Sequence, residues 1–150
     1  MKMSSLKTRI QSCEHCPLYK NMEVSPIAPE WIGKPEIMIV VGTAPKKEND
    51  FAQEVITGVD RFLLNSMFAK HNLKYYMTFL TKCIGATKVG CVKTCVRNWI
   101  PEELGLVKPK LIIGMGSNVE KYLECDYYLP APSIVFANKA NQEKLEGILN

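Results

Sequence analysis

Short apolar runs alternate with amphipathic stretches along this chain. The runs have the length of strands, and two of them end at glycine, which is typical of strands buried on both faces of a parallel sheet. The predicted strands are 36–42, 75–81, 110–116 and a shorter one at 133–137. The remaining pattern predicts helices at 4–12, 57–68, 92–106, 117–123 and 141–149, with loops at 21–35 and 43–50. Strands that alternate with helices predict a three-layer α/β/α fold around a central, mostly parallel, four-stranded sheet.

Three details of this pattern concern the site, one helix and the core. The loop at 43–50 leaves the carboxyl end of the first strand, which is the edge at which open α/β sheets bind ligands. Pro101 is expected near a start or a kink of the helix at 92–106. The side chains of the helix at 57–68 expected to face the core are Val59, Phe62, Leu63, Met67 and Phe68.

Length and composition narrow the class of protein. A chain of 150 residues is predicted to form one domain, spanning 1–150. No apolar run approaches a membrane span, and the first ten residues lack the apolar centre of a secretory signal. We therefore expect an intracellular, cytoplasmic protein without membrane contact. In a reducing compartment, six cysteines indicate metal binding rather than a disulfide framework.

Five of the six cysteines fall into two clusters. Cys13 and Cys16 form a Cys-x2-Cys pair, which supplies two thiolates from one tight turn. Two more ligands must come from elsewhere, and the second cluster, with Cys83, Cys91 and Cys95, is the obvious donor. We predict that four thiolates from these segments hold one inorganic centre. The residues alone leave open whether it is an iron–sulfur cluster or zinc, and whether Cys91 or Cys95 takes part.

Positive charge is concentrated in the segment 69–110, which surrounds the second cysteine cluster. It contains eight Lys or Arg against two acids, Glu102 and Glu103; the basic residues are Lys70, Lys74, Lys82, Lys88, Lys93, Arg97, Lys108 and Lys110. Such a segment is consistent with a footprint for a phosphate backbone. Charge alone supports equally well an interpretation in which these side chains are solvated at the ends of helices.

The order of several motifs is more specific than any one of them. It runs Cys-x2-Cys-Pro-Leu from Cys13, Val-Gly-Thr-Ala-Pro from Val41, Gly58, Thr-Lys-Cys ending at Cys83, Cys95, and the stretch 103–116. In this order, over roughly residues 6 to 123, the chain resembles the iron–sulfur uracil-DNA glycosylases of families 4 and 5.

The resemblance implies a uracil-DNA glycosylase-like fold and a [4Fe–4S] cluster, while the cysteine spacing keeps zinc as the alternative. By position, the cluster ligands would be Cys13, Cys16, Cys83 and Cys95, with Cys91 as a competitor. Outside this set, Cys125 is interpreted as a buried or idle thiol, and His15 as a solvated loop residue. The expected nucleic-acid interface combines the loop after the first strand with lysines of the basic segment: Thr43, Ala44, Pro45, Lys46, Lys47, Lys82, Lys88 and Lys93.

The catalytic motifs of that family are degenerate in this chain. Thr43 replaces an acid, Ile56 replaces a stacking Phe, Phe79 replaces the Asn that reads the uracil edge, and no His follows His71. Lys46 also replaces a glycine. Each such contact contributes about 2–4 kcal/mol to transition-state stabilisation, so their joint loss is expected to abolish efficient excision.

Three hypotheses follow from these residues. The first is a glycosylase-fold [4Fe–4S] protein that has lost standard uracil excision and binds DNA or a protein partner in replication, repair or a viral program. The second is an active base-excision glycosylase with a rebuilt pocket, for which Glu48 and Asp50 are weak catalytic candidates and Asn49 a further one. The third is a zinc-stapled α/β module that binds proteins.

Overall fold

We analysed a computed structural model of the chain, which describes residues 2–15, 26–83, 89–116 and 118–150. In this part of the chain, five strands form one sheet in the order β1-β3-β2-β4-β5. Their bounds are β1 Glu30–Trp31, β2 Ile37–Val41, β3 Tyr75–Phe79, β4 Leu111–Met115 and β5 Tyr127–Leu129. All neighbouring strands are parallel except β1, which runs antiparallel to β3 at the edge. The carboxyl ends of β2, β3 and β4 therefore meet at one end of the sheet.

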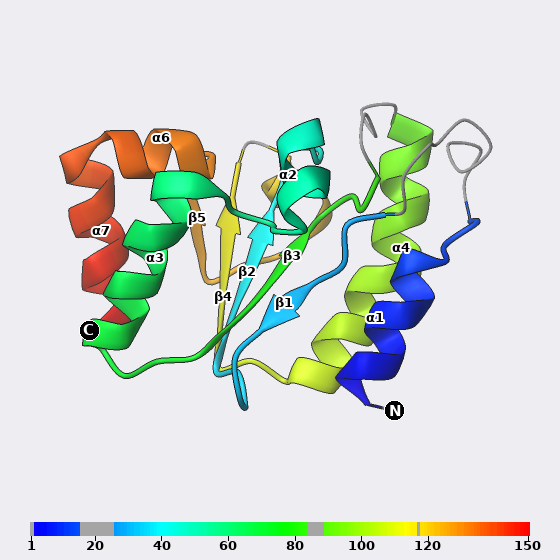
Figure 1. Cartoon of the computed structure of the whole chain (residues 1–150), viewed down its shortest axis with the longest axis horizontal. Helices are drawn as coiled ribbons and strands as arrows, with labels where there is room; N and C mark the ends of the chain where they lie inside the picture. The colour runs from blue at the N-terminus through cyan, green and yellow to red at the C-terminus, as the bar shows by residue number, and fades with distance from the viewer. Residues whose placement is uncertain (1, 16–25, 84–88, 117) are drawn as a thin grey trace.

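Helices cover both faces of this sheet (Figure 1). Their bounds are α1 Met3–Gln11, α2 Lys47–Ala52, α3 Gly58–Lys70, α4 Val89–Val107, α5 Val119–Tyr122, α6 Pro132–Ala137 and α7 Lys139–Leu149. In the view of Figure 1, α3, α6 and α7 lie on one side of the sheet and α1 and α4 on the other. The α/β class, with a mostly parallel central sheet in three layers, is confirmed.

The two faces of β2 explain why its sequence is a continuous apolar run. Ile37, Ile39 and Val41 belong to the core beneath α3, α6 and α7. Met38 and Val40 alternate with them and belong to the core beneath α4. All five side chains are buried, because a central parallel strand is covered by helices on both sides.

Two strands differ from the sequence-based prediction. The stretch predicted as the strand 133–137 is helical and forms most of α6, because Pro132 fixes the first turn of a helix and Val135 and Phe136 then fall on its buried side. The sheet is completed instead by β5, whose Tyr127 and Tyr128 are exposed at an edge. A fifth strand, β1, lies within the expected loop at 21–35, of which residues 21–25 are outside the described part.

The helices also correct the prediction in several places. On α3, Val59 is 72% and Phe62 70% exposed, so the expected inward position of these two residues is wrong. Leu64 and Phe68 are buried instead, with Leu63 and Met67 half-buried beside them. The remaining corrections concern helix ends: α4 continues through Pro101, the loop expected at 43–50 becomes helical from Lys47, and α5 has only four residues.

In the residues described by the structure, no helix combines the length and the apolar character that crossing a membrane requires.

Candidate metal centre and nucleic-acid interface

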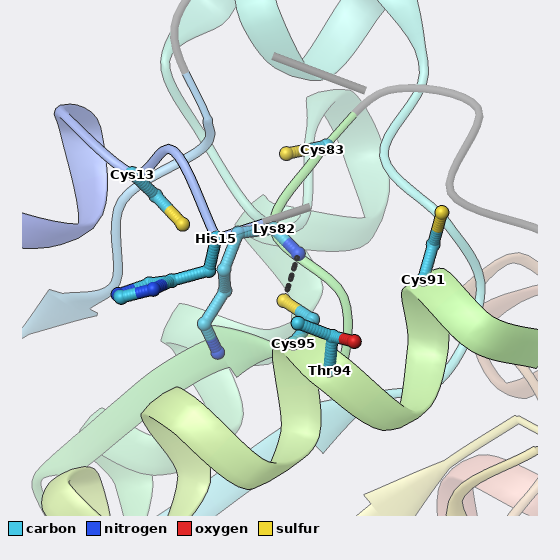
Figure 2. A pocket seen from close by; sticks show the side chains of 7 residues that line it. All are labelled: Cys13, His15, Lys82, Cys83, Cys91, Thr94 and Cys95. Atoms are coloured by element: carbon cyan, nitrogen blue, oxygen red, sulfur yellow. Dashed lines mark hydrogen bonds between the residues drawn. The ribbon is translucent and has the colours of Figure 1, made fainter. Parts of the chain in front are cut away.

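Cysteines from three separate segments surround one hollow beside the carboxyl end of β3, which we call the cysteine hollow. Its described lining consists of Cys13, His15, Lys82, Cys83, Cys91, Thr94 and Cys95 (Figure 2). In Figure 2, Cys13, Cys83 and Cys95 approach the hollow from different sides, and Cys91 lies at its edge on the preceding turn of α4. The structure therefore brings together three of the four predicted ligands. Cys16, the fourth, lies outside the described residues.

Packing of α1 against α4 places the first of these cysteines. Leu6 and Ile10 of α1 are fully buried in a small core with Cys95 and Trp99 of α4. The helix α1 ends at Gln11, so the chain emerges at Cys13 directly beside the first turns of α4. An apolar stripe on α1 with a four-residue spacing thus delivers the N-terminal cysteine to the hollow.

The other cysteines follow from the end of β3 and from helical periodicity. Beyond β3, the Leu80 N–H donates a 2.8 Å hydrogen bond to the Val41 carbonyl, so the chain remains beside β2 until shortly before Cys83. Cys91 and Cys95 stand four residues apart on α4, which places them on one face of the helix.

Two N–H groups donate hydrogen bonds to sulfur atoms of the hollow. The backbone N–H of Lys82 donates to Cys95 Sγ at 3.3 Å, and the indole Nε1–H of Trp99 donates to Cys13 Sγ at 3.3 Å. Donors of this kind favour the thiolate, which is the form that binds metal, and they tune iron–sulfur centres. Cys95 and Cys13 thus each accept a hydrogen bond of the kind that a metal-bound thiolate would use.

Burial raises the pKa of the Cys95 thiol, and the neighbouring Cys13 raises it further, whereas the charge and the N–H of Lys82 act in the opposite direction. Without a cation the Cys95 thiol is therefore held protonated. A bound metal ion reverses this balance, because it deprotonates a coordinating thiol. A metal ion binding at the cysteine hollow would therefore have to displace the proton of this thiol.

By their chemistry, thiol donors suit either of the two predicted centres. Cys13, Cys83 and Cys95 would hold a [4Fe–4S] cluster or zinc, with Cys91 available beside them. Such a centre would supply a rigid cross-link between α1, the end of β3 and α4. In the described ranges, no three His, Cys, Asp or Glu side chains are placed as a ready-made site for a metal ion. His15 is exposed and its ring contacts Trp99 edge-on with centroids 5.5 Å apart, and the half-buried Cys125 does not line the hollow.

Lys82 is not the exposed phosphate ligand that the sequence suggested. Its side chain is fully buried, and Nζ lies 2.6 Å from Oε1 of the equally buried Glu103. The ammonium also donates to Thr78 Oγ1 at 2.8 Å and to the Phe79 carbonyl. The other carboxylate oxygen of Glu103 accepts a 2.7 Å hydrogen bond from the Tyr76 hydroxyl. The prediction for Lys82 is wrong, because all the polar contacts of its side chain are made inside the protein.

Sequence reasoning missed Glu103 as the partner of Lys82. The signal was present, since Glu103 stands four residues after Trp99 and four before Val107, both of which are buried on α4. A carboxylate on the apolar stripe of a helix requires a partner, because burial of an unpaired charge is strongly unfavourable.

A second hollow, which we call the strand-end hollow, lies at the carboxyl ends of β2 and β3 and has a volume of about 250 Å³. Its lining contains Thr43, Ile56 and Phe79, three positions that the resemblance assigns to a base-binding pocket. Val41, Val55, Ile56 and Phe79 are buried and form an apolar floor. The other lining residues are Ala44, Lys46, Glu48, Asn49, Thr57, Asp60, Ala131, Pro132 and Ser133.

The side-chain amide of Asn49 connects two backbone segments that line this hollow. Its Oδ1 accepts a 2.8 Å hydrogen bond from the Lys46 N–H, and its Nδ2 donates to the carbonyls of Glu54 and Val55 at 3.0 and 3.1 Å. Asn49 is therefore engaged in positioning the loop rather than available to a ligand. Burial raises the pKa of the Asp60 carboxyl, which lines the same hollow.

The remaining predicted interface residues have varied surroundings. Thr43, Lys46, Lys47 and Lys93 are exposed, Ala44 is half-buried and Pro45 is buried. Lys88 lies outside the described residues. Of the weak catalytic candidates, Glu48 is exposed at the strand-end hollow, and Asp50 belongs to α2.

Neither a protein-family model nor a curated protein matches this sequence.

Proposed function

We propose that this chain is an iron–sulfur protein with a uracil-DNA glycosylase-like fold that binds DNA and does not carry out standard uracil excision. The observation that supports the proposal most is the convergence of Cys13, Cys83 and Cys95 on one hollow from segments far apart in the sequence. The chain keeps these three cysteines together, while the strand-end hollow has an apolar floor.

The proposed DNA-binding face is the carboxyl end of the sheet. Lys46 and Lys47 stand exposed at the start of α2, and Lys93 is exposed on α4 between Cys91 and Cys95. Ammonium groups on one end of a sheet suit a phosphate backbone, which binds through charge without reading sequence.

The loss of excision rests on the floor of the strand-end hollow. A flipped uracil needs donors and acceptors for its edge. At the position of the edge-reading amide stands Phe79, which is 2% exposed and carries no polar atom in its side chain. The amide of Asn49 cannot replace it, since its oxygen and nitrogen are already bonded to the backbone.

Anaerobic purification followed by a visible spectrum and by iron, sulfide and zinc analysis tests the cofactor. We expect a brown protein with about four irons and four sulfides per chain. A colourless protein with one zinc would support the third hypothesis instead, a zinc-stapled module, which the same thiolates also fit.

DNA binding and excision are tested separately. We expect salt-sensitive binding of an oligodeoxynucleotide, weakened in the variant K46E/K47E, and no strand breaks in uracil-containing DNA after alkali. If the protein has no affinity for DNA at low salt, a protein partner in replication or repair becomes the better proposal.

An active glycosylase with a rebuilt pocket is the second candidate function. It is favoured by the Asp60 carboxyl, whose pKa is raised by burial at the strand-end hollow, and by Glu48 in the same lining. Strand breaks in DNA with deaminated bases, which disappear in Asp60→Asn, would establish this activity and overturn the first proposal.

A further inference from the structure

We propose that the amino ends of the strands carry a second anion-binding site, which takes phosphate groups at the end of the sheet opposite the cysteine hollow. The site is a hollow of about 560 Å³, which we call the basic hollow. Its lining consists of Lys34, Pro35, Glu36, Lys74, Leu106, Val107, Lys108 and Lys110. The inference goes beyond the proposed function, since it requires neither a metal at the cysteine hollow nor a ligand in the strand-end hollow.

The fold divides the positive charge of the segment 69–110 between distant places. Lys82 is buried against Glu103, and Lys70 is paired with Glu146. Lys74, Lys108 and Lys110 do not lie near the cysteines. Lys74 immediately precedes β3, and Lys108 and Lys110 follow α4. Lys34, in the turn before β2, lines the same hollow. In Figure 1 these turns lie along the lower edge, whereas the first turns of α4 lie at the upper edge.

Backbone hydrogen bonds fix three of the lysine-bearing turns relative to one another. The Glu36 N–H donates to the Lys74 carbonyl at 3.0 Å, and the Lys110 N–H donates to the Glu36 carbonyl at 2.8 Å. These bonds continue the pairing of β2 with β3 and with β4. The positions of the lysines are therefore anchored to the sheet, so a ligand does not have to order these turns when it binds.

Gly33 and Lys74 give one ammonium a defined position. Gly33 has φ +53°, and a Cβ there would lie 3.0 Å from both Cδ and Nζ of Lys74. The Lys74 side chain thus lies along the backbone of the glycine, and a larger residue would displace it. Glycine at this position serves both the turn and the close approach of the lysine.

The charges around the basic hollow are unbalanced. All four lysines are exposed, and within the described ranges none of them has an acid within salt-bridge distance. Glu36 is the only carboxylate in the described lining. Other bases, such as Arg61 with Glu30 and Glu54, are paired. A bound anion relieves the mutual repulsion of four ammonium groups, and lysine is a common ligand of phosphate.

Two kinds of ligand would present phosphate oxygens to the basic hollow. One is the phosphodiester backbone of a nucleic acid, and the other is a free polyphosphate. Pro35, Leu106 and Val107 form an apolar wall that is compatible with either ligand. The sugar of a nucleic acid would contact this wall, whereas a free polyphosphate would bind through the lysines alone.

The test uses the full chain and two probes. A fluorescein-labelled single-stranded oligodeoxynucleotide is followed by anisotropy over a salt series, and inorganic tripolyphosphate is followed by calorimetry. The test variant is K74E/K110E. The matched control is K139E/K144E, which changes two exposed lysines of α7 and gives the same net charge.

We expect at least one probe to bind K74E/K110E about tenfold more weakly, with a salt slope smaller by about 2 for the oligonucleotide. The control should bind within about twofold of the unmodified chain. Loss of oligonucleotide binding supports a nucleic-acid backbone, and loss confined to tripolyphosphate supports a free polyphosphate. Thermal unfolding of each variant checks that it is folded. If K74E/K110E does not fold, the milder variant K74A/K110A takes its place.

Three outcomes would overturn the inference. They are binding of neither probe, equal loss in both double variants, and unchanged binding in K74E/K110E. If K46E/K47E loses the oligonucleotide while K74E/K110E retains both probes, the proposed DNA-binding face is supported and the basic hollow is contradicted. The reverse result supports binding at the basic hollow and contradicts the proposed DNA-binding face at Lys46 and Lys47.

Discussion

The ammonium of Lys82 and the carboxylate of Glu103 form a 2.6 Å ion pair with both side chains fully buried. The pair joins the chain just beyond β3 to the C-terminal part of α4, and Tyr76 and Thr78 make further hydrogen bonds to it. Because Lys82 immediately precedes Cys83 and donates its own N–H to Cys95, the pair also fixes the position of two predicted metal ligands. The fold tolerates a buried ion pair whose hydrogen bonds are satisfied, whereas one buried charge without its partner is strongly destabilising.

Removal of one partner should therefore destabilise the fold strongly. We expect Glu103→Gln to lower the free energy of unfolding by about 3–5 kcal/mol, since it leaves the Lys82 ammonium buried without a counter-charge. Urea denaturation followed by circular dichroism measures the change.

The adjacent residue offers the control for this measurement. Glu102 pairs with Arg9 at 2.6 Å, also between α1 and α4, but both side chains are exposed. Glu102→Gln should leave the unfolding free energy close to that of the unmodified chain, because water screens exposed pairs. Equal effects of the two substitutions would contradict the burial argument.

Substitution of single cysteines should separate ligands from bystanders. We expect Cys13→Ser, Cys16→Ser, Cys83→Ser and Cys95→Ser each to lower the iron content, the thermal stability and DNA binding, because the predicted centre cross-links α1 and the end of β3 to α4. Cys125→Ser should retain the metal, since Cys125 does not line the cysteine hollow. Cys91→Ser decides the competition for the fourth position, and iron retained in Cys95→Ser but lost in Cys91→Ser would reverse our assignment.

Two phenylalanines of α3 test which face of this helix is buried. Phe68 is 2% exposed, so Phe68→Ala should lower the unfolding free energy by about 3–5 kcal/mol through lost burial and a cavity. Phe62 is 70% exposed, so Phe62→Ala should change it by about 0.5 kcal/mol at most. Comparable losses in the two variants would restore the inward face predicted from the sequence.

Cys125 should give the stability a dependence on alkaline pH. Burial, with a contribution from Asp126, raises the pKa of its thiol from 9.0 to about 11. The folded state therefore holds the proton more tightly than the unfolded chain. Its contribution to stability is complete below pH 9.0 and disappears as the pH rises towards about 11.

The comparison of Cys125→Ala with the unmodified chain isolates this contribution from the titration of lysines and tyrosines. The difference in unfolding free energy between the two proteins should shift in favour of the variant as the pH rises through this window. A difference that does not change with pH would show that the thiol ionises equally in both states.

Much of the fold could be predicted because its central strands carry a strong local signal. β2, β3 and β4 are short, mostly buried runs rich in apolar residues, and the glycines after β2 and within β4 favour strands over helices. The stretch 133–137 failed because five apolar residues are equally compatible with a short helix, and a proline at the start decided between them. β1 has two residues, and its pairing with β3 is fixed by tertiary contacts rather than by its own sequence.

The meeting of Cys13, Cys83 and Cys95 could be predicted because a Cys-x2-Cys pair supplies only two of the four ligands of one centre, so the second cysteine cluster was expected beside the first. The role of Lys82 could not, since a lysine in a basic segment is indistinguishable from its solvated neighbours until the fold places Glu103 against it. The basic hollow was hidden for a related reason. Lys34 is distant in sequence from Lys108 and Lys110, and only the strand order brings these residues together.

A single helix, α4, spans the distance between the two ends of the molecule. Nineteen residues at 1.5 Å per residue give a rod of about 28 Å, with Cys91 and Cys95 in its first turns and Lys108 just beyond its last. One residue inserted between Cys95 and Glu103 would turn the two parts of the rod by about 100° relative to each other. The thiols and the carboxylate could then no longer face the core together, so we expect the length of this interval to tolerate no insertion or deletion.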